Sequence, residues 1–205
     1  MIMPNTVFVK KYNAPPIDKN EILRYAGVRE TTAELERILD ECLLETENKL
    51  TYKVCYRKFN VLEKDGCFDI GFAVSNSKNL SCYLNGCHEI LLFAATVGLE
   101  IDRLIARNAY VSPTKSLMLQ AIGAERIESL CDSFSNDMAL LASKNNEILC
   151  NRYSPGYGDF PLEMQKDIFA ALDCSKNIGL SLNESLLMSP SKSVTAIIGV
   201  RHKGE

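Results

Sequence analysis

The apolar pattern near the N-terminus predicts a strand followed by two helices. Residues 5–12 (NTVFVKKY) are typical of a short strand. Asp18 followed by Glu21 resembles a capping box, so we expect a helix that begins there and runs to about Gly27. A second helix is expected to open at Thr31. Its apolar stripe, at helical spacing, consists of Leu35, Ile38, Leu39, Cys42 and Leu43.

The period then changes from helical to strand-like. From Leu50 to Arg57 apolar and polar residues alternate, which predicts a half-buried strand. Lys64-Asp65-Gly66 is a turn signal, and alternation returns from Phe68 to Val74, so we expect a hairpin in an antiparallel sheet. The apolar run Glu89–Val97 predicts a buried strand.

The remaining elements follow from caps and breakers. Ser112 offers a capping hydroxyl and Pro113 fits the first helical position, so a long helix is expected from there to about Ala142. Further helices are expected over Lys78–Leu84, Glu100–Asn108 and Leu162–Leu172. Further strands are expected over Glu147–Tyr153 and Val194–Val200.

Strands and helices mix without a repeating βαβ unit, which favours an α+β fold over a doubly wound one. We expect a single compact domain over residues 1–205, with a mixed, mainly antiparallel sheet flanked by helices. Residues 1–50 would form its mainly helical N-terminal portion. No stretch has the composition of a linker.

Composition and charge narrow the class of protein. Of the 205 residues 46% are hydrophobic, which excludes a disordered chain. Lys and Arg number 23 against 26 Asp and Glu, and no basic cluster is longer than Lys10-Lys11, so we expect no nucleic-acid partner. The longest apolar run, Ile90–Val97, is far shorter than a membrane span, so no membrane association is expected.

The eight cysteines form no C-x-x-C pair, and no signal peptide is recognised at the N-terminus. We therefore expect reduced thiols and a cytoplasmic protein. Cys82, Cys87 and His88 are the nearest approach to a metal cluster, but ordinary thiols are the favoured interpretation and no metal site is predicted. His202, in a polar tail, is assigned no role.

The densest local signal is residues 151–161, NRYSPGYGDFP. Gly156 and Gly158 permit a positive φ and a close approach of a ligand to the backbone. Arg152 offers a planar fork of donors for a carboxylate or phosphate, and Tyr157 offers a flat face for a ring or a cation. The segment is thus a candidate binding loop.

A structural turn is the alternative for this segment, with Asp159 capping the helix that follows. The pair of glycines is a poor dinucleotide fingerprint, because the helix-opening glycine is missing. The sequence holds no P-loop, G-x-S-x-G or H-E-x-x-H motif, so hydrolase and zinc-protease chemistry lacks its residues.

Two motifs carry a resemblance to a known family. Residues 152–157 (RYSPGY) fit R-x-x-x-G-Y, the S-adenosylmethionine-binding signature of the activation domain of cobalamin-dependent methionine synthase. Residues 179–190 (GLSLNESLLMSP) resemble that family's G-x-x-L-T-E-S-x-x-M-x-P segment, and Ser193-Val194 matches its S-V pair. The resemblance is strongest over residues 110–200.

The resemblance implies a set of ligand-binding residues. Arg152 would meet the carboxylate of S-adenosylmethionine, and backbone groups around Ser154 and Gly156 would hold the ligand. Tyr157 would bind it and also face the corrin. Glu184 would serve the ammonium or brace its loop. No residue is expected to act as an acid or base, since the contribution would be positioning.

The resemblance also implies a function. The chain would be a free-standing, S-adenosylmethionine-binding reactivation partner of a methionine synthase that has no activation domain of its own. It would support the reductive methylation of cob(II)alamin to methylcobalamin, with the cobalamin carried by the partner and flavodoxin or ferredoxin as electron donor. Because the cobalt comes from the partner, the chain would not be a complete enzyme alone.

Two other functions stay open. Asn183 stands in place of the family's Thr and Ala196 in place of a common Gly, and an acidic ligand-binding residue of the family's N-terminal portion maps to no position here. These departures motivate a module that docks on a corrinoid protein without using S-adenosylmethionine. Glu128 is a candidate replacement acid, although a solvated helix-face acid is the more ordinary interpretation. An independent methyltransferase is disfavoured by the missing glycines.

Overall fold

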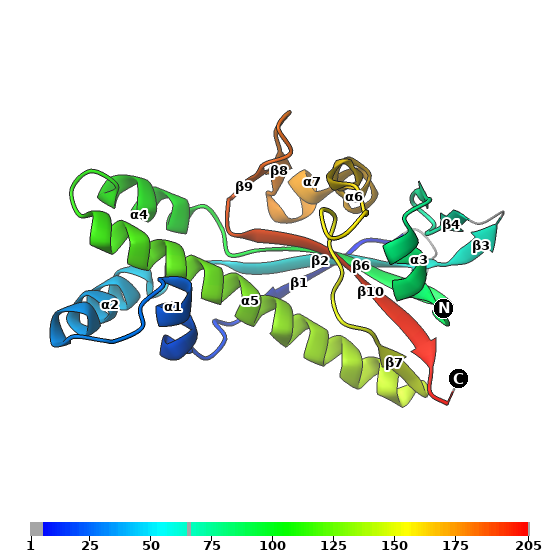
Figure 1. The fold of residues 1–205 in the computed structure, drawn as a ribbon, viewed down its shortest axis with the longest axis horizontal. Coiled ribbons are helices and arrows are strands. Elements are labelled where there is room, and N and C mark those ends of the chain that lie inside the picture. The colour runs from blue at the N-terminus through cyan, green and yellow to red at the C-terminus, as the bar shows by residue number, and fades with distance from the viewer. Residues whose placement is uncertain (1–5, 65–66, 205) are drawn as a thin grey trace.

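A five-stranded antiparallel sheet forms the centre of the molecule (Figure 1). The computed structural model describes residues 6–64 and 67–204. In sheet order the strands are β1 (Phe8–Tyr12), β2 (Tyr52–Asn60), β6 (Glu89–Thr96), β10 (Ser193–His202) and β7 (Glu147–Leu149). The α+β class with flanking helices is confirmed. Every strand pair within the described ranges is antiparallel, so the minor parallel component that we expected is not seen there.

The strand that begins near Leu50 was predicted correctly, but its predicted partner is wrong. β2 pairs along one edge with β1 and along the other with β6, so that Tyr56 lies opposite both Phe8 and Phe93. With both edges occupied, it has none left for the residues after the turn. Those residues form β4 (Cys67–Asp69) and β5 (Val74–Ser75), which make a small separate sheet with β3 (Leu62–Lys64). The turn residues 65–66 and residue 5 of the first predicted strand lie outside the described residues.

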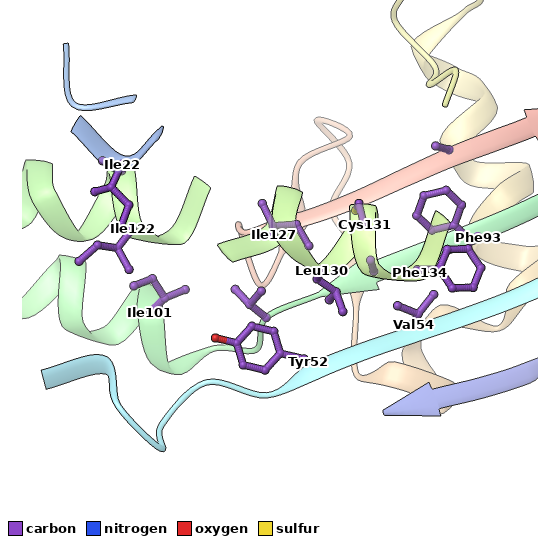
Figure 2. Close-up of a cluster of buried hydrophobic side chains, with 14 of the residues drawn as sticks. Ile22, Tyr52, Val54, Phe93, Ile101, Ile122, Ile127, Leu130, Cys131 and Phe134 are labelled. Atoms are coloured by element: carbon purple, nitrogen blue, oxygen red, sulfur yellow. The ribbon is translucent and has the colours of Figure 1, made fainter. Parts of the chain in front are cut away.

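One face of the sheet is covered by α5 (Pro113–Lys144), a 32-residue helix that runs obliquely across the strands (Figure 1). Around its N-terminal half lie α1 (Lys19–Tyr25), α2 (Ala33–Thr46) and α4 (Glu100–Asn108). Phe134 of α5 packs its ring on Phe93 of β6 and on Tyr56 of β2 (Figure 2 shows the first pair). No helix within residues 6–64 and 67–204 combines the length and apolar character needed to cross a membrane.

The opposite face carries shorter elements: α3 (Lys78–Leu84), a 3₁₀ turn (Leu162–Met164), α6 (Gln165–Leu172) and α7 (Cys174–Ile178). A two-stranded hairpin of β8 (Ser181–Leu182) and β9 (Met188–Ser189) follows. A hydrophobic core lies on each face of the sheet, and β6 contributes side chains to both. Leu91, Phe93 and Ala95 point toward α5, while Ile90, Leu92 and Ala94 point the other way. Its continuous apolar run is explained by burial on both sides.

Most helix starts agree with the sequence, although the helix expected from Leu162 begins as a 3₁₀ turn and α6 itself starts at Gln165. Asp18 caps α1 as expected, accepting from the backbone N–H of Asn20 and Glu21. The cap of α2 is Thr32, one residue later than expected, and its Oγ1 accepts from Leu35 N at 3.3 Å. Ser112 precedes α5 but makes no side-chain capping bond, so Pro113 alone carries the start signal there.

Asp159 does not cap the helix that follows it, so that part of the structural-turn interpretation is wrong. Its carboxylate instead reaches α3, accepting from Lys78 N at 2.8 Å, from Asn79 N at 3.1 Å and from the Ser77 hydroxyl. These N–H groups at the start of α3 have no helical partner, which is why they need an outside acceptor. The Ser77 hydrogen bond, with the backbone bonds, lowers the pKa of Asp159.

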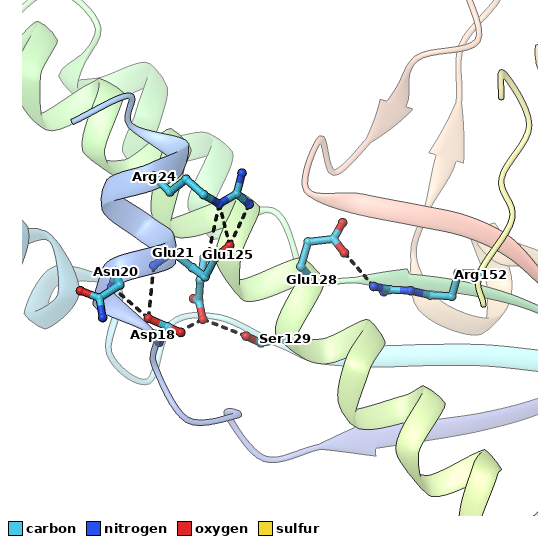
Figure 3. Close-up of polar contacts among 8 residues, drawn as sticks. All are labelled: Asp18, Asn20, Glu21, Arg24, Glu125, Glu128, Ser129 and Arg152. Carbon is cyan, nitrogen blue, oxygen red and sulfur yellow. Dashed lines mark hydrogen bonds and ion pairs between the residues drawn. The ribbon is translucent and has the colours of Figure 1, made fainter. Parts of the chain in front are cut away.

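A buried ion pair fixes the N-terminal segment to α5. Glu125 and Arg126 are each 2% exposed and pair with one another. Arg126 also donates to the carbonyls of Pro15 and Pro16 at 2.6 and 2.7 Å. Glu125 accepts from Ser129 Oγ at 2.8 Å and from the backbone N–H before α1 (Figure 3). Since each buried charge is satisfied, the pair is tolerated inside the protein.

Replacing Arg126 should therefore destabilise the whole fold. Arg126→Met leaves the Glu125 carboxylate buried without its cation and two carbonyls without a donor, so we expect a loss of about 3–5 kcal/mol in the free energy of unfolding. Urea denaturation measures it. The matched control is Arg24→Met, which removes an exposed ion pair with Glu21 and should change stability little. Equal effects of the two variants would contradict the anchoring role.

The cap on α3 predicts a pH dependence of stability. Because folding lowers the pKa of Asp159, its carboxylate stabilises the native state above the ordinary Asp pKa of about 3.9, and this contribution is lost as the pH falls through the lower folded value. Asp159→Asn should lower the melting temperature at pH 7. The difference in melting temperature between the variant and the native chain should disappear toward pH 3. A gap that persists unchanged at acid pH would refute the charged cap.

Candidate functional site

The loop after β7 is fixed to the centre of β10. Tyr153 exchanges two backbone hydrogen bonds with Ile197, at 2.9 and 2.8 Å. Phe160 is 1% exposed and anchors the far end of the loop in the core beneath α6. Between them the chain folds on itself through a 2.8 Å bond from Gly156 N to the Phe160 carbonyl. The predicted strand thus shortens to β7 plus one bridge, and the loop is held at both ends.

The two loop glycines have the positive φ that was predicted, for different reasons. Gly156 has φ 93°, and a Cβ there would meet only Leu162 Cδ1 at 3.4 Å. Gly158 has φ 57° and lies against the Asn79 side chain of α3, so a Cβ at this position would clash. Gly156 is needed for conformation, whereas Gly158 is needed both for conformation and for the close contact with α3.

Arg152 points from the loop toward α5. Its Nη2 donates to Glu128 Oε2 and to Asp132 Oδ1, both at 2.9 Å (Figure 3 shows the Glu128 contact). The two acids are four residues apart and share a helix face. Burial disfavours the charged guanidinium, but Cys131 and the two carboxylates outweigh burial and raise the pKa of Arg152. The side chain therefore keeps its positive charge.

One nitrogen of this guanidinium makes no hydrogen bond within the described chain. Arg152 Nη1 is buried and has no hydrogen-bond partner among the described residues. A buried donor without an acceptor costs about 1–3 kcal/mol, so such a group is a natural point of attachment for a ligand.

A hollow of about 400 Å³ opens beside Arg152. That volume lies within the range of roughly 300–1,000 Å³ typical of small-molecule sites. The walls come from the loop, α5, the start of α6, β9 and the start of β10. The lining residues are Glu128, Arg152, Tyr153, Ser154, Pro155, Tyr157, Gln165, Met188, Ser193, Val194 and Thr195.

Gln165, the first residue of α6, is a site residue that the sequence did not reveal. It is 6% exposed, and its Oε1 has no hydrogen-bond partner within the described part of the chain. Two residues that line the hollow, Gln165 and Arg152, thus have an unmet acceptor and an unmet donor. By contrast the Ser193 hydroxyl is occupied, since it lies 2.8 Å from both Thr96 Oγ1 and the Pro190 carbonyl.

The tyrosines of the loop differ in exposure. Tyr153 is stacked between Tyr83 and Phe160, with ring centroids 4.8 and 5.9 Å apart, and supports the loop. Tyr157 is 66% exposed at the rim of the hollow. Its ring is therefore free to meet a ligand or a partner.

The predicted site residues are only partly brought together. Arg152, Ser154 and Tyr157 line the hollow, and Gly156 lies between them in the same loop without lining it. Glu184 is exposed in the turn between β8 and β9 and does not line the hollow. A larger hollow, of about 830 Å³, lies beside α2 and β2 and is lined by no residue of either motif.

Comparison with known proteins identifies the family and the fold. The model of the family "Vitamin B12 dependent methionine synthase, activation domain" matches residues 84–204, which contain the loop, α5, α6 and β10. A crystal structure of the MetH reactivation domain bound to AdoHcy superimposes with a TM-score of 0.67 over 98% of this chain and 79% of that one, at 17% identity. No curated protein matches. Since the family model spans more than half of the sequence and both motifs, this chain belongs to the activation-domain family of vitamin B12-dependent methionine synthases.

Proposed function

We propose that the chain binds S-adenosylmethionine in the hollow beside Arg152 and supports reactivation of a cobalamin-dependent methionine synthase. The observation that carries the proposal is the buried, unpartnered Nη1 of Arg152 in the wall of that hollow. A guanidinium is well suited to hold a carboxylate. The solved relative of the same fold is described as bound to AdoHcy, a ligand that has the same amino-acid end.

The walls of the hollow fit the other groups of this ligand. Gln165 Oε1 is an acceptor for an ammonium or a hydroxyl. Glu128 lines the hollow, and Asp132 lies beside it on α5, so two carboxylates stand near the cationic groups of the ligand. Glu128 is paired with Arg152 and is therefore more than a solvated acid on the helix face.

The residues of the chain would act by positioning. Arg152 and Gln165 would hold the amino-acid end of S-adenosylmethionine. The backbone around Ser154 and Gly156 would determine how far the ligand enters the hollow. Tyr157 would face a docked corrin, and its exposure at the rim supports this role. When bound, S-adenosylmethionine supplies a methyl group, and the partner's cobalamin supplies the metal that receives it after reduction by flavodoxin or ferredoxin. Orientation of this kind needs no protein acid or base.

We propose that the cobalamin is carried by another module, and the alignment of 98% of this chain with a reactivation domain supports this. We propose that this module belongs to a methionine synthase without its own activation domain, in the cytoplasm and in methionine biosynthesis. Glu184, exposed on the β8–β9 turn, would then brace its turn or meet the partner and would not touch the ligand in the free chain.

Arg152→Met should weaken binding of S-adenosylmethionine by about 1.5–3 kcal/mol, because a charge-assisted hydrogen bond to the carboxylate is lost. Isothermal titration of the purified chain measures this as roughly a ten- to hundred-fold rise in Kd. Arg24→Met, which removes an exposed arginine on α1, is the control and should bind like the native chain. Unchanged affinity of Arg152→Met would place the carboxylate elsewhere.

Gln165→Met keeps the length of the side chain and removes the unmet acceptor. We expect a loss of about 0.5–1.5 kcal/mol in ligand binding, the usual worth of one hydrogen bond. Gln165→Glu, which keeps an acceptor, should bind at least as well as the native chain if the group facing it is the ammonium. A Gln165→Met variant with native affinity would remove Gln165 from the site.

A docking module that does not use S-adenosylmethionine is the second candidate, and one contact favours it. Glu128 and Asp132 already occupy Nη2 of Arg152 and would compete with the ligand's carboxylate. Titration of the chain with S-adenosylmethionine distinguishes the two functions. It is done alone and in the presence of a cobalamin-loaded methionine synthase that lacks its activation domain. Binding of S-adenosylmethionine in either setting, with methylcobalamin formed on reduction, supports the first function. Docking without any S-adenosylmethionine binding supports the second.

A further inference from the structure

Three strand ends meet at the edge of the sheet farthest from α4, where β7 and the end of β10 lie side by side (Figure 1). Glu147 of β7 and His202 of β10 are directly opposite in the antiparallel register. His88, just before β6, joins them because its N–H donates to the Val200 carbonyl at 3.1 Å. The only two histidines of the chain are thus brought together with one carboxylate.

The donor atoms of this cluster are close enough to share an ion. His88 Nε2 lies 3.2 Å from Glu147 Oε1, and the His88 and His202 rings stack with centroids 4.2 Å apart. One donor atom from each of the three residues lies within 4.8 Å of the other two. Ligands around tetrahedral zinc, at about 2.0–2.2 Å from the metal, are separated by roughly 3.4 Å. Because a ring nitrogen binds a metal in the plane of its own ring, the exposed His202 ring has to rotate out of its parallel stack on His88 when the ion binds.

Two atoms of the cluster are unsatisfied without a ligand. Glu147 Oε2 and His88 Nδ1 are both buried and have no hydrogen-bond partner among the described residues. The Glu147 side chain is only 12% exposed, so water does not readily replace the missing partner. The hydrogen bond from His88 uses only Oε1 of Glu147, so Oε2 stays without a partner in the described part of the chain, whereas a metal ion attracts both carboxylate oxygens.

We propose that His88, Glu147 and His202 bind a divalent transition-metal ion of the zinc class. Two imidazoles and one carboxylate suit Zn²⁺ and its first-row neighbours, whereas Mg²⁺ and Ca²⁺ prefer oxygen ligands throughout. The ion ties the end of β10 to β7 and to the start of β6. The site is separate from the hollow, since Thr195 and His202 are seven positions apart along β10, or roughly 23 Å.

The cluster is not the one to which the sequence pointed. Cys82, Cys87 and His88 do not come together as a group of possible ligands within residues 6–64 and 67–204, while Glu147 and His202 lie far from His88 in sequence. Cys87 does lie near Cys150, with the sulfurs 3.8 Å apart. Thiols also bind zinc, so these cysteines have to be separated from the proposed ligands by experiment.

Isothermal titration of the metal-free, reduced full chain with Zn²⁺ tests the site. We expect one equivalent to bind, and Glu147→Gln, which keeps the shape of the side chain, to weaken binding at least about ten-fold, as does His202→Ala. Zn²⁺ should also raise the melting temperature of the native chain and not of Glu147→Gln. Native-like circular dichroism establishes that the variants are folded. Native affinity in Glu147→Gln would overturn the proposal.

The matched control is the double variant Cys87→Ala/Cys150→Ala, with Cys82→Ala made separately because that thiol is exposed. Both should bind Zn²⁺ as the native chain does. Co²⁺ as a probe should give ligand-field bands without thiolate-to-cobalt charge transfer. Binding that disappears only in the cysteine variants, a thiolate band, or no binding of Zn²⁺ at all would each overturn the site.

Discussion

The packing of α5 across the sheet is the contact on which the other parts depend. Phe134 fixes the helix over β2 and β6, and this sets the rotation of every other α5 side chain about the helix axis. Arg126 then faces the N-terminal segment, while Glu128 and Asp132 face the loop after β7. One helix thus aligns the N-terminal helices with the candidate site, although these regions do not belong to one contiguous stretch of sequence.

The candidate site combines a rigid frame with incomplete polar pairing. Arg152 is held on one side by α5, and its loop is bridged to β10, so its guanidinium is pre-oriented. Its remaining nitrogen and the Gln165 oxygen are the unsatisfied groups, and buried polar groups are rarely left so without a functional reason. Pre-orientation reduces the entropic cost of binding, because few side chains have to be ordered.

The elements whose bounds depend on neighbouring residues were predicted correctly from the sequence. The bounds of α3 and α4 agree with the sequence, since caps and a glycine break act within a few residues. The partner of β2 and the target of Asp159 were mispredicted, because both depend on which strand edges and helix ends distant segments leave open; Asp159 is 81 residues from Lys78. Likewise a motif could indicate Arg152, whereas Gln165 is an ordinary helix residue until the fold turns it toward the hollow.

The position of β10 in the sheet determines the order in which the chain can fold. β10 lies between β6 and β7, although more than 90 residues separate it from β6 along the chain. During synthesis one edge of β6, which is apolar from Ile90 to Ala95, stays unpaired until residues 193–202 have left the ribosome, and exposed edges of this kind promote aggregation. The same residues complete the wall of the hollow and the bridge to Tyr153. The candidate site of the nascent chain is therefore completed only at the step that also protects the edge of β6.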